Sequence, residues 1–371
     1  MSAILSQAQA LVSQLQTLMP SSYQQDSLQA LLGLFLEGQG YPLPEHCQTK
    51  SASALSRFLN EYKWSTRQVI RAVRTAAIQQ ILCQPRVGRR PTLQVILDLT
   101  TLEKTGKFKE FKDLIRVYNG KRGLHVVMLY IVVGQWRVPW AFQVYRGKDT
   151  PSPTQLGLRL VRRLPKILTG RFEVLVLADT AFGTNGFITS VRRLKHHALI
   201  GVRCDRKLEN GRRLAHLHKR GQQVRLLGLK FSVHLSWYYL NRSDGKLEKR
   251  YILCTKALKG STMNWWGRRR WSIEGFFKTA KHRFGLHRFG QQTLLGVYRW
   301  LVLSLTAYLL SHWVHLYSGG GAMPDWGEAA QKALELLLPL MALLPLLAEL
   351  QRLRPLAKSY GLDINLTWCK I

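Results

Sequence analysis

The stretch TLQVILDLT (residues 92–100) is a short, nearly continuous apolar run that contains a single carboxylate. Its length and its β-branched residues predict a buried strand. Four further runs have the same character: GLHVVMLYIVVG (123–134), WRVPWAFQVY (136–145), FEVLVLAD (172–179) and HALIGVR (197–203). Helical patterns are expected over residues 154–168 and 184–195. Three adjacent strands followed by helix, strand, helix and strand predict a mixed α/β sheet.

The ninety residues before this sheet read as helices. Apolar periodicity predicts helices over Ser6–Leu18 and Ser27–Leu36, and two more that meet near Lys63. Ser65 or Thr66 is a plausible N-cap of the last of these.

One stripe of that last helix is basic, because Arg67, Arg71 and Arg74 follow one another at positions i, i+4 and i+7. Ile70, Val73 and Ala77 form the neighbouring apolar stripe. Helix-turn-helix modules present such an arrangement to DNA. An ordinary solvated basic face is the alternative.

The chain as a whole is strongly basic. Lys and Arg outnumber Asp and Glu by 55 to 21, which gives a formal net charge of +34 and a pI near 10.5. Because 46% of the residues are hydrophobic and 11 are Trp, the charge belongs to a folded protein. Nucleic acid is therefore the expected partner. The five cysteines form no C-x-x-C pair, which favours a reduced cytoplasmic protein without a zinc site.

Two carboxylates stand out within this basic chain. Asp98 and Asp179 are both expected at the C-terminal ends of hydrophobic strands, where open sheets bind ligands and metals. Each of them alone could equally be a turn-forming Asp.

A third carboxylate, Glu274, lies among cations in RRRWSIEGFFKTAKHRFGL (268–286). On a helix, Arg270, Glu274 and Lys281 share one face, while Ile273, Phe276, Ala280 and Phe284 gather towards the opposite side. Surface ion pairs, each worth about 0.3–0.5 kcal/mol, would explain the pairing. They would not explain the two upstream Asp residues.

The spacing resembles that of the DDE transposases of bacterial insertion sequences, in the group with a Tyr-x2-Arg-x3-Glu-x6-Lys signature. Arg270, Glu274 and Lys281 match the signature, Asp98 in DLT matches the first Asp and Asp179 the second. Gly267 stands at the signature's Tyr position. The resemblance covers roughly residues 50–316 and implies an RNase H-like catalytic core with a β-rich insertion. It also implies a homodimer in the synaptic complex.

The chemistry of such an enzyme accounts for the residue types. Phosphodiester hydrolysis followed by strand transfer uses two divalent ions about 3.5–4 Å apart. Mg²⁺, or Mn²⁺, prefers oxygen ligands. Asp98, Asp179 and Glu274 are therefore expected to be the catalytic metal ligands for two ions. Arg270, Lys278 and Lys281 are expected to hold flanking phosphates.

The expected organisation has five segments. They are a helical DNA-binding domain (1–90), the first part of the RNase H-like core (91–204), a β-rich insertion (205–255), the closing core helices (256–317) and a helical C-terminal tail (318–371). The apolar run Leu301–Tyr317 falls short of the roughly 20 residues of a membrane span, so a buried helix over Gly296–Leu316 is expected. The tail run ALELLLPLMALLPLLAEL is expected to form helices broken at Pro339 and Pro345.

The expected function is cut-and-paste transposition of an insertion sequence. The chain would recognise terminal inverted repeats in double-stranded DNA, cleave there with divalent metal and join the ends to target DNA. A bacterial cytoplasm, at the nucleoid and away from membranes, is the expected location. The alternatives are a domesticated or non-transposing DNA-binding protein and a nuclease on the same fold. Trp237, Trp265 and Trp266 are weaker candidates for stacking on an unstacked base.

Overall fold

The computed structural model describes residues 2–37, 41–83, 90–106, 114–241, 245, 247–321 and 323–365. The chain forms two compact units. Unit 1 comprises Met1–Val73 and Ala280–Ile371, and unit 2 comprises Arg74–Thr279. The ends of the chain thus fold together, and the five expected segments remain a prediction.

Unit 1 is helical. Its helices are α1 (Ser2–Thr17), α2 (Ser22–Glu37), α3 (Ala52–Asn60), α10 (Leu294–Tyr317), α11 (Trp326–Leu337) and α12 (Pro339–Ser359), with a 3-10 turn η1 (Pro44–His46). Helix α10 lies at the centre of this unit, against α1, α2, α3 and α11. Within the described residues it is the one helix long and apolar enough to cross a membrane, and 83% of its apolar window is buried in the protein. The buried helix expected over Gly296–Leu316 is confirmed.

A buried arginine fixes the connection between α3 and the next helix. Arg299 of α10 is 2% exposed and stacks 4.0 Å from the ring centroid of Trp64. Its guanidinium donates to the carbonyl oxygens of Phe58, Leu59, Tyr62 and Trp64 and to the Thr66 hydroxyl, at 2.7–3.2 Å. These bonds satisfy carbonyls that the end of α3 leaves without helical partners.

Helix α4 (Thr66–Leu82) begins as expected, because the Ser65 hydroxyl accepts a hydrogen bond from the Gln68 amide at 3.2 Å. Of the predicted apolar stripe, Ala77 is buried, whereas Ile70 and Val73 are half-buried. Val69, Ala72 and Ala76 are also buried.

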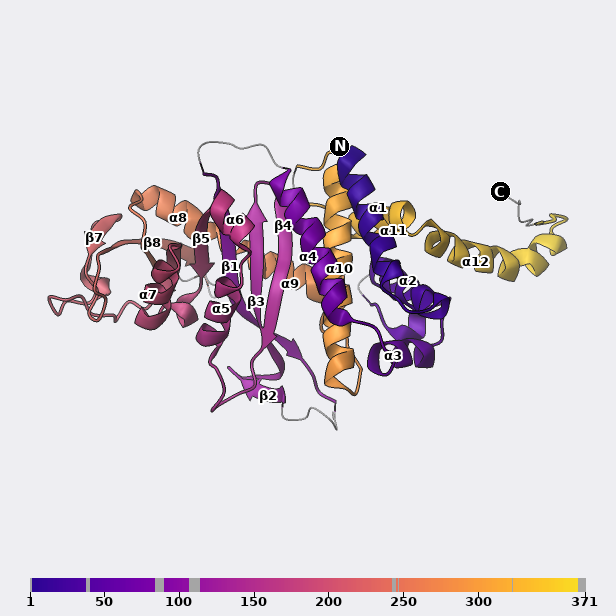
Figure 1. Ribbon diagram of the computed structural model, residues 1–371, viewed down its shortest axis with the longest axis horizontal. Helices are drawn as coiled ribbons and strands as arrows, with labels where there is room; N and C mark the ends of the chain where they lie inside the picture. The colour runs from indigo at the N-terminus through magenta and orange to yellow at the C-terminus, as the bar shows by residue number, and fades with distance from the viewer. Residues whose placement is uncertain are drawn as a thin grey trace. The chain divides into compact units, whose positions relative to one another are not determined.

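Unit 2 contains one sheet, with nine strands among the described residues. They are β1 (Thr92–Glu103), β2 (Ile115–Tyr118), β3 (Lys121–Val133), β4 (Trp136–Val144), β5 (Glu173–Ala178), β6 (His197–Val202), β7 (Gln222–Val224), β8 (Val233–Asn241) and β9 (Leu247–Cys254). The strand order is β2-β3-β1-β5-β6-β9-β8-β7, and β4 also pairs with β3. Figure 1 shows β4, β3, β1 and β5 side by side.

The strands β4, β3, β1, β5 and β6 form the RNase H-like part of the sheet. β4, β3 and β1 are antiparallel, and β1, β5 and β6 are parallel. The mixed α/β fold predicted from the sequence is therefore confirmed. Strands β7, β8 and β9 belong to the expected β-rich insertion, and β9 pairs antiparallel with β6. The insertion extends the core sheet.

The helices of unit 2 are α5 (Pro153–Arg162), α6 (Lys166–Arg171), α7 (Asn185–Arg193), α8 (Gly260–Arg269) and α9 (Ser272–His282), the last reaching into unit 1. The single helix expected over residues 154–168 is wrong, because Pro165 is the N-cap of a separate helix α6. In the tail, the expected break at Pro339 is observed. The break expected at Pro345 is wrong, since α12 runs through that position.

Candidate active site

Asp98 lies within β1, and the expectation that it ends its strand is wrong. β1 continues to Glu103 because β3 pairs with it through Gly123. The parallel partner β5 ends at Ala178, opposite Leu97. Asp98 is thus the first residue of β1 beyond the parallel pairing, at the edge where a crevice opens in an α/β sheet.

Asp179 follows the last residue of β5 and is the N-cap of the 3-10 turn η3 (Thr180–Phe182). Its carboxylate accepts a hydrogen bond from the Ala181 amide at 3.0 Å. The backbone here passes close to Gly201 of β6. A Cβ atom at position 201 would lie 2.9 Å from the Thr180 amide nitrogen, so a glycine allows the approach. The expected position of Asp179 at a strand end is confirmed.

Glu274 is in the first turn of α9, which packs by its apolar face. Ile273 and Phe276 are fully buried, and the Phe276 ring stacks on Tyr130 of β3 with centroids 4.7 Å apart. Burial of such a side chain stabilises the fold by roughly 1.5–3 kcal/mol. The sequence predicts one helix through residues 268–286. The structure instead ends α8 at Arg269 and begins α9 at Ser272.

Arg270 joins the first and third acids. Its guanidinium donates to Asp98 Oδ2 at 3.3 Å and to Glu274 Oε1 at 3.0 Å. The side chains of Arg270 and Asp98 are each 14% exposed, and that of Glu274 is 41% exposed. The contact with Glu274 has the expected i,i+4 spacing, although Arg270 is the C-cap of α8 and Glu274 lies in α9. The contact with Asp98 joins α8 to the central strand.

Asp98 and Asp179 directly follow Leu97 and Ala178, the last pair of the parallel β1–β5 ladder, so the two aspartates are neighbours. Burial, followed by the negative charge of Asp179, raises the pKa of Asp98 from 3.8 to about 7, and Glu274 adds a smaller contribution. Burial also raises the pKa of Asp179, while Arg270 and hydrogen bonds from the backbone oppose that shift. Two buried carboxylates near each other disfavour their charged forms. A cation beside them would favour those forms.

Within the described residues, no group of three or more His, Cys, Asp and Glu side chains lies close enough to hold a metal ion. Arg270 instead bonds to two of the acids. The donors available are nevertheless all carboxylate oxygens, which suit hard divalent cations. Burial makes the charged forms of Asp98 and Asp179 unfavourable, so a bound cation would stabilise those forms. On both counts the residues fit divalent metal ions.

The predicted DNA contacts differ in their surroundings. Arg67 and Arg71 are exposed on α4, whereas Arg74 is half-buried and donates to the Trp140 carbonyl at 3.1 Å. Lys278 is exposed on α9, and Lys281 is half-buried in its last turn. The role of all of these residues in DNA binding remains a prediction.

The tryptophans predicted to stack on DNA also differ. Trp265 is 49% exposed, and the Arg269 guanidinium lies 3.8 Å from its ring centroid. Trp266 is half-buried against Trp265. Trp237 on β8 is 6% exposed. Stacking of a base on any of the three remains a prediction.

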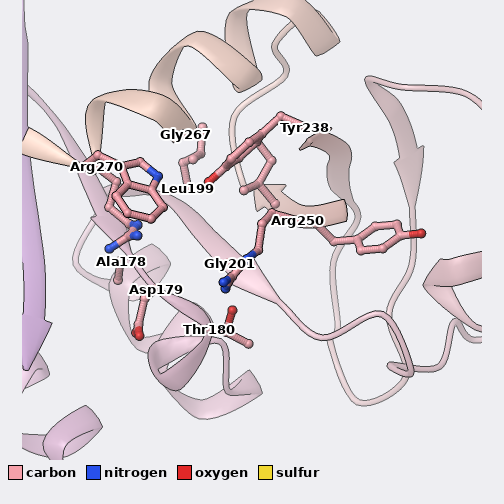
Figure 2. A pocket seen from close by; sticks show the side chains of 12 residues that line it. Ala178, Asp179, Thr180, Leu199, Gly201, Tyr238, Arg250, Gly267 and Arg270 are labelled. Atoms are coloured by element: carbon pink, nitrogen blue, oxygen red, sulfur yellow. The ribbon is translucent and has the colours of Figure 1, made fainter. Parts of the chain in front are cut away.

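A pocket borders Asp179 on the side of the insertion. It is lined by Ala178, Asp179, Thr180, Leu199, Gly201, Tyr238, Arg250, Tyr251, Ile252, Gly267, Arg270 and Trp271 (Figure 2). Tyr238 and Arg250 come from β8 and β9 and were not predicted as site residues. The sequence carries no motif at these two positions. The glycine at the signature's tyrosine position is the one sequence feature that indicated this part of the site. Gly267, where the signature has tyrosine, belongs to α8 and lies against Tyr238 of β8 and Ile252 of β9.

Comparison with known proteins assigns the chain to a family. Residues 89–310, more than half of the chain, match the family described as Transposase DDE domain. No curated protein matches the chain. Among solved structures, the chain is similar to a piggyBac transposase seen by cryo-EM in a synaptic complex with hairpin DNA. The two are 12% identical with a TM-score of 0.50, over 99% of this chain and 84% of the other. At this identity the likeness shows the fold.

Proposed function

The chain belongs to the transposases with a DDE domain, and from this premise we propose that it moves an insertion sequence by cutting at terminal inverted repeats. DDE transposases are DNA-cleaving and strand-transferring enzymes that use divalent metal ions, and this chain is one of them. Beyond the family, we propose three points. They are the kind of DNA end that is cut, the residues that act in catalysis and DNA binding, and membership of the bacterial insertion-sequence group with the Tyr-Arg-Glu-Lys signature.

One observation carries the assignment of the site. Asp98 and Asp179 lie at adjacent positions of neighbouring parallel strands, and Arg270 connects Asp98 to Glu274. These residues lie far apart in the sequence, and a set of unrelated surface ion pairs gives no reason for them to meet at a crevice edge. Their meeting supports the proposal that the three acids form one catalytic centre.

Asp98, Asp179 and Glu274 would hold two Mg²⁺ or Mn²⁺ ions in this centre. Bound there, such ions supply activation of the attacking oxygen and stabilisation of the leaving oxygen. The protein supplies the positions. Asp98 is fixed by the sheet and by a 2.8 Å hydrogen bond from the Leu99 amide, and Asp179 is fixed by the Ala181 amide. Carboxylates held this firmly lose little entropy when they bind a cation.

Arg270 has two functions in this proposal. Without metal its single positive charge offsets part of the negative charge of Asp98 and Glu274. With DNA in the site its planar guanidinium can bind a phosphate in two-point geometry. Lys278 and Lys281, both on α9, would bind flanking phosphates. Arg67, Arg71 and Arg74 would contribute to recognition of the repeat by residues 1–90.

The proposed partners are double-stranded transposon ends and target DNA. A homodimer in the synaptic complex is proposed because two ends must be processed together. The proposed location is the bacterial cytoplasm, at the nucleoid. A DNA-binding descendant without catalysis would need no acid cluster, so the presence of all three acids favours the enzyme over that alternative.

The test uses a labelled duplex that carries the element's terminal repeat, taken from the DNA flanking the gene. The purified chain should nick this end and join it to target DNA in Mg²⁺ or Mn²⁺, and it should do neither in EDTA. A nuclease on the same fold would cleave but leave no joined product. A non-catalytic binder would shift the duplex in a gel without cutting it.

A further inference from the structure

The pocket beside Asp179 is built partly by the insertion. Within unit 2, η3 and β6 supply Thr180 and Gly201, α8 supplies Gly267, and the insertion strands supply Tyr238 and Arg250. Figure 2 shows the Arg250 side chain directed towards Asp179 and Thr180, with Tyr238 on the same side of the pocket. Residues outside the acid cluster therefore reach the edge of the proposed centre.

Gly267 makes room for Tyr238. A Cβ atom at position 267 would lie 3.0 Å from Cε1 of Tyr238 and 3.1 Å from Cδ1 of Ile252. The Tyr238 residue is 6% exposed, so its ring is held in place between the strand and α8. No described residue forms a hydrogen bond with its hydroxyl group. An aromatic hydroxyl thus enters this pocket from β8, next to the position where the signature carries tyrosine.

Arg250 stands directly across from Tyr238 in the β8–β9 pairing, so both side chains lie on one face of the sheet. It lines the same pocket as Asp179. It also forms a 2.8 Å ion pair with Glu248, and the Arg250 side chain remains 45% exposed. A guanidinium with this exposure has donors left for a ligand, because it carries five N–H groups.

The polar groups that surround the pocket, apart from Asp179, are mainly donors. Arg250 and Arg270 present guanidinium groups, and Tyr238 and Thr180 present hydroxyls. Guanidinium and hydroxyl donors that line one pocket suit a tetrahedral anion better than a base edge, which requires acceptors as well. On a DNA substrate that anion is a backbone phosphate.

We propose that this pocket binds one phosphate of the DNA strand entering the active site, and that Arg250 and the Tyr238 hydroxyl are its contacts from the insertion. The inference rests on the proposed function, since the phosphate arrives with the DNA to be cleaved. It gives the β-rich insertion a direct part in holding substrate. Arg250 and Tyr238 act by positioning the strand.

The experiment replaces one phosphate at a time with neutral methylphosphonate along the strand near the cleavage site. Cleavage rate and DNA affinity are measured for the wild type, R250Q, Y238F and R225Q. Arg225 is the matched control, because it lies in the same insertion and pairs with Glu209 at 3.6 Å outside the pocket. Y238F keeps the ring that packs on Gly267 and removes only the hydroxyl.

For the wild type, one methylphosphonate position should lower both affinity and rate, by about tenfold for a lost charged contact. R250Q should show a similar loss on unmodified DNA and little further loss at that position, because the two changes remove the same contact. Y238F should show a smaller loss at the same position. R225Q should retain the wild-type pattern.

Additive losses for R250Q and the methylphosphonate, or wild-type affinity of R250Q, would overturn the phosphate site. The affinity measurement decides this even if the wild type cuts no DNA, which would instead refute the proposed function. A third arm adds inorganic phosphate. If inorganic phosphate competed with DNA for the wild type but not for R250Q, while R250Q still bound DNA as tightly as the wild type, the pocket would be assigned to a free anion. That result would also overturn the proposal.

Discussion

Arg270 donates to Asp98 across 172 positions of sequence, with its Nη1 atom 3.3 Å from Asp98 Oδ2. The same guanidinium also bonds to Glu274. The basic residue expected on DNA phosphate is therefore, in the protein alone, the counter-charge of the acids. The ion pair makes the positions of β1, α8 and α9 depend on one side chain.

Removal of this counter-charge should destabilise the metal-free protein. R270Q leaves two partly buried carboxylates without their guanidinium, and such a loss costs about 1–3 kcal/mol. The melting temperature in EDTA should therefore fall by several degrees. K278A, a change at an exposed position of α9, should melt like the wild type. Equal melting temperatures for R270Q and the wild type would show that the ion pair contributes no stability.

The stability of the metal-free protein should fall as the pH rises. Burial raises the pKa of Asp98 from 3.8 to about 7. Between these two values the folded protein binds more protons than the unfolded chain, so the stability linked to Asp98 is lost across this range. Melting in EDTA at about pH 5 and about pH 8 measures the loss, and D98N should reduce it. A pH dependence unchanged in D98N would contradict the shift.

Arg299 should be among the most important residues for the stability of unit 1. R299M removes five hydrogen-bond contacts and leaves the buried carbonyls of Leu59 and Trp64 without those donors, while the Phe58 carbonyl keeps its bond from the Trp64 indole. An expected cost of about 3 kcal/mol or more follows from the unsatisfied groups. Urea denaturation measures it, with the exposed change R67M as the control. A loss no greater than that of R67M would mean that water replaces the guanidinium.

The basic face of α4 should contribute to DNA binding through its exposed arginines. The double change R67Q/R71Q should weaken binding to the terminal repeat and reduce the slope of log K against log salt by about two. Fluorescence anisotropy over a range of salt concentrations measures this slope. R74Q should instead lower stability, because Arg74 bonds to the Trp140 carbonyl. An unchanged slope for the double variant would show that the basic face of α4 is an ordinary solvated face that does not contact DNA.

The elements of the core could be read from the sequence because each has a strong local pattern. The apolar runs around Val95, Val127 and Val176 became β1, β3 and β5, and the apolar face of residues 273–280 became the packed face of α9. Asp98 and Asp179 were found as candidates because each interrupts or ends such a run. Their adjacency follows from parallel pairing of the two strands.

Other features depend on contacts that no local pattern records. Asp98 lies within its strand because β3 extends the pairing past the end of β5. The bond from Arg270 to Asp98 is tertiary. Tyr238 and Arg250 reach the pocket because β9 pairs with β6 and so joins the insertion to the core sheet. The sequence predicts the strands of the insertion but not the core strand, β6, with which β9 pairs.

The central claim, that Asp98, Asp179 and Glu274 act as one metal site, is tested most directly by cleavage of a labelled repeat end by E274Q, D98N and D179N. Each reaction is run in Mg²⁺, Mn²⁺ and EDTA beside a melting curve. Each variant should fold and bind the repeat, while nicking and strand transfer fall by orders of magnitude, and double variants should be little worse than single ones. Wild-type cleavage by well-folded E274Q, or full activity in EDTA, would contradict the account.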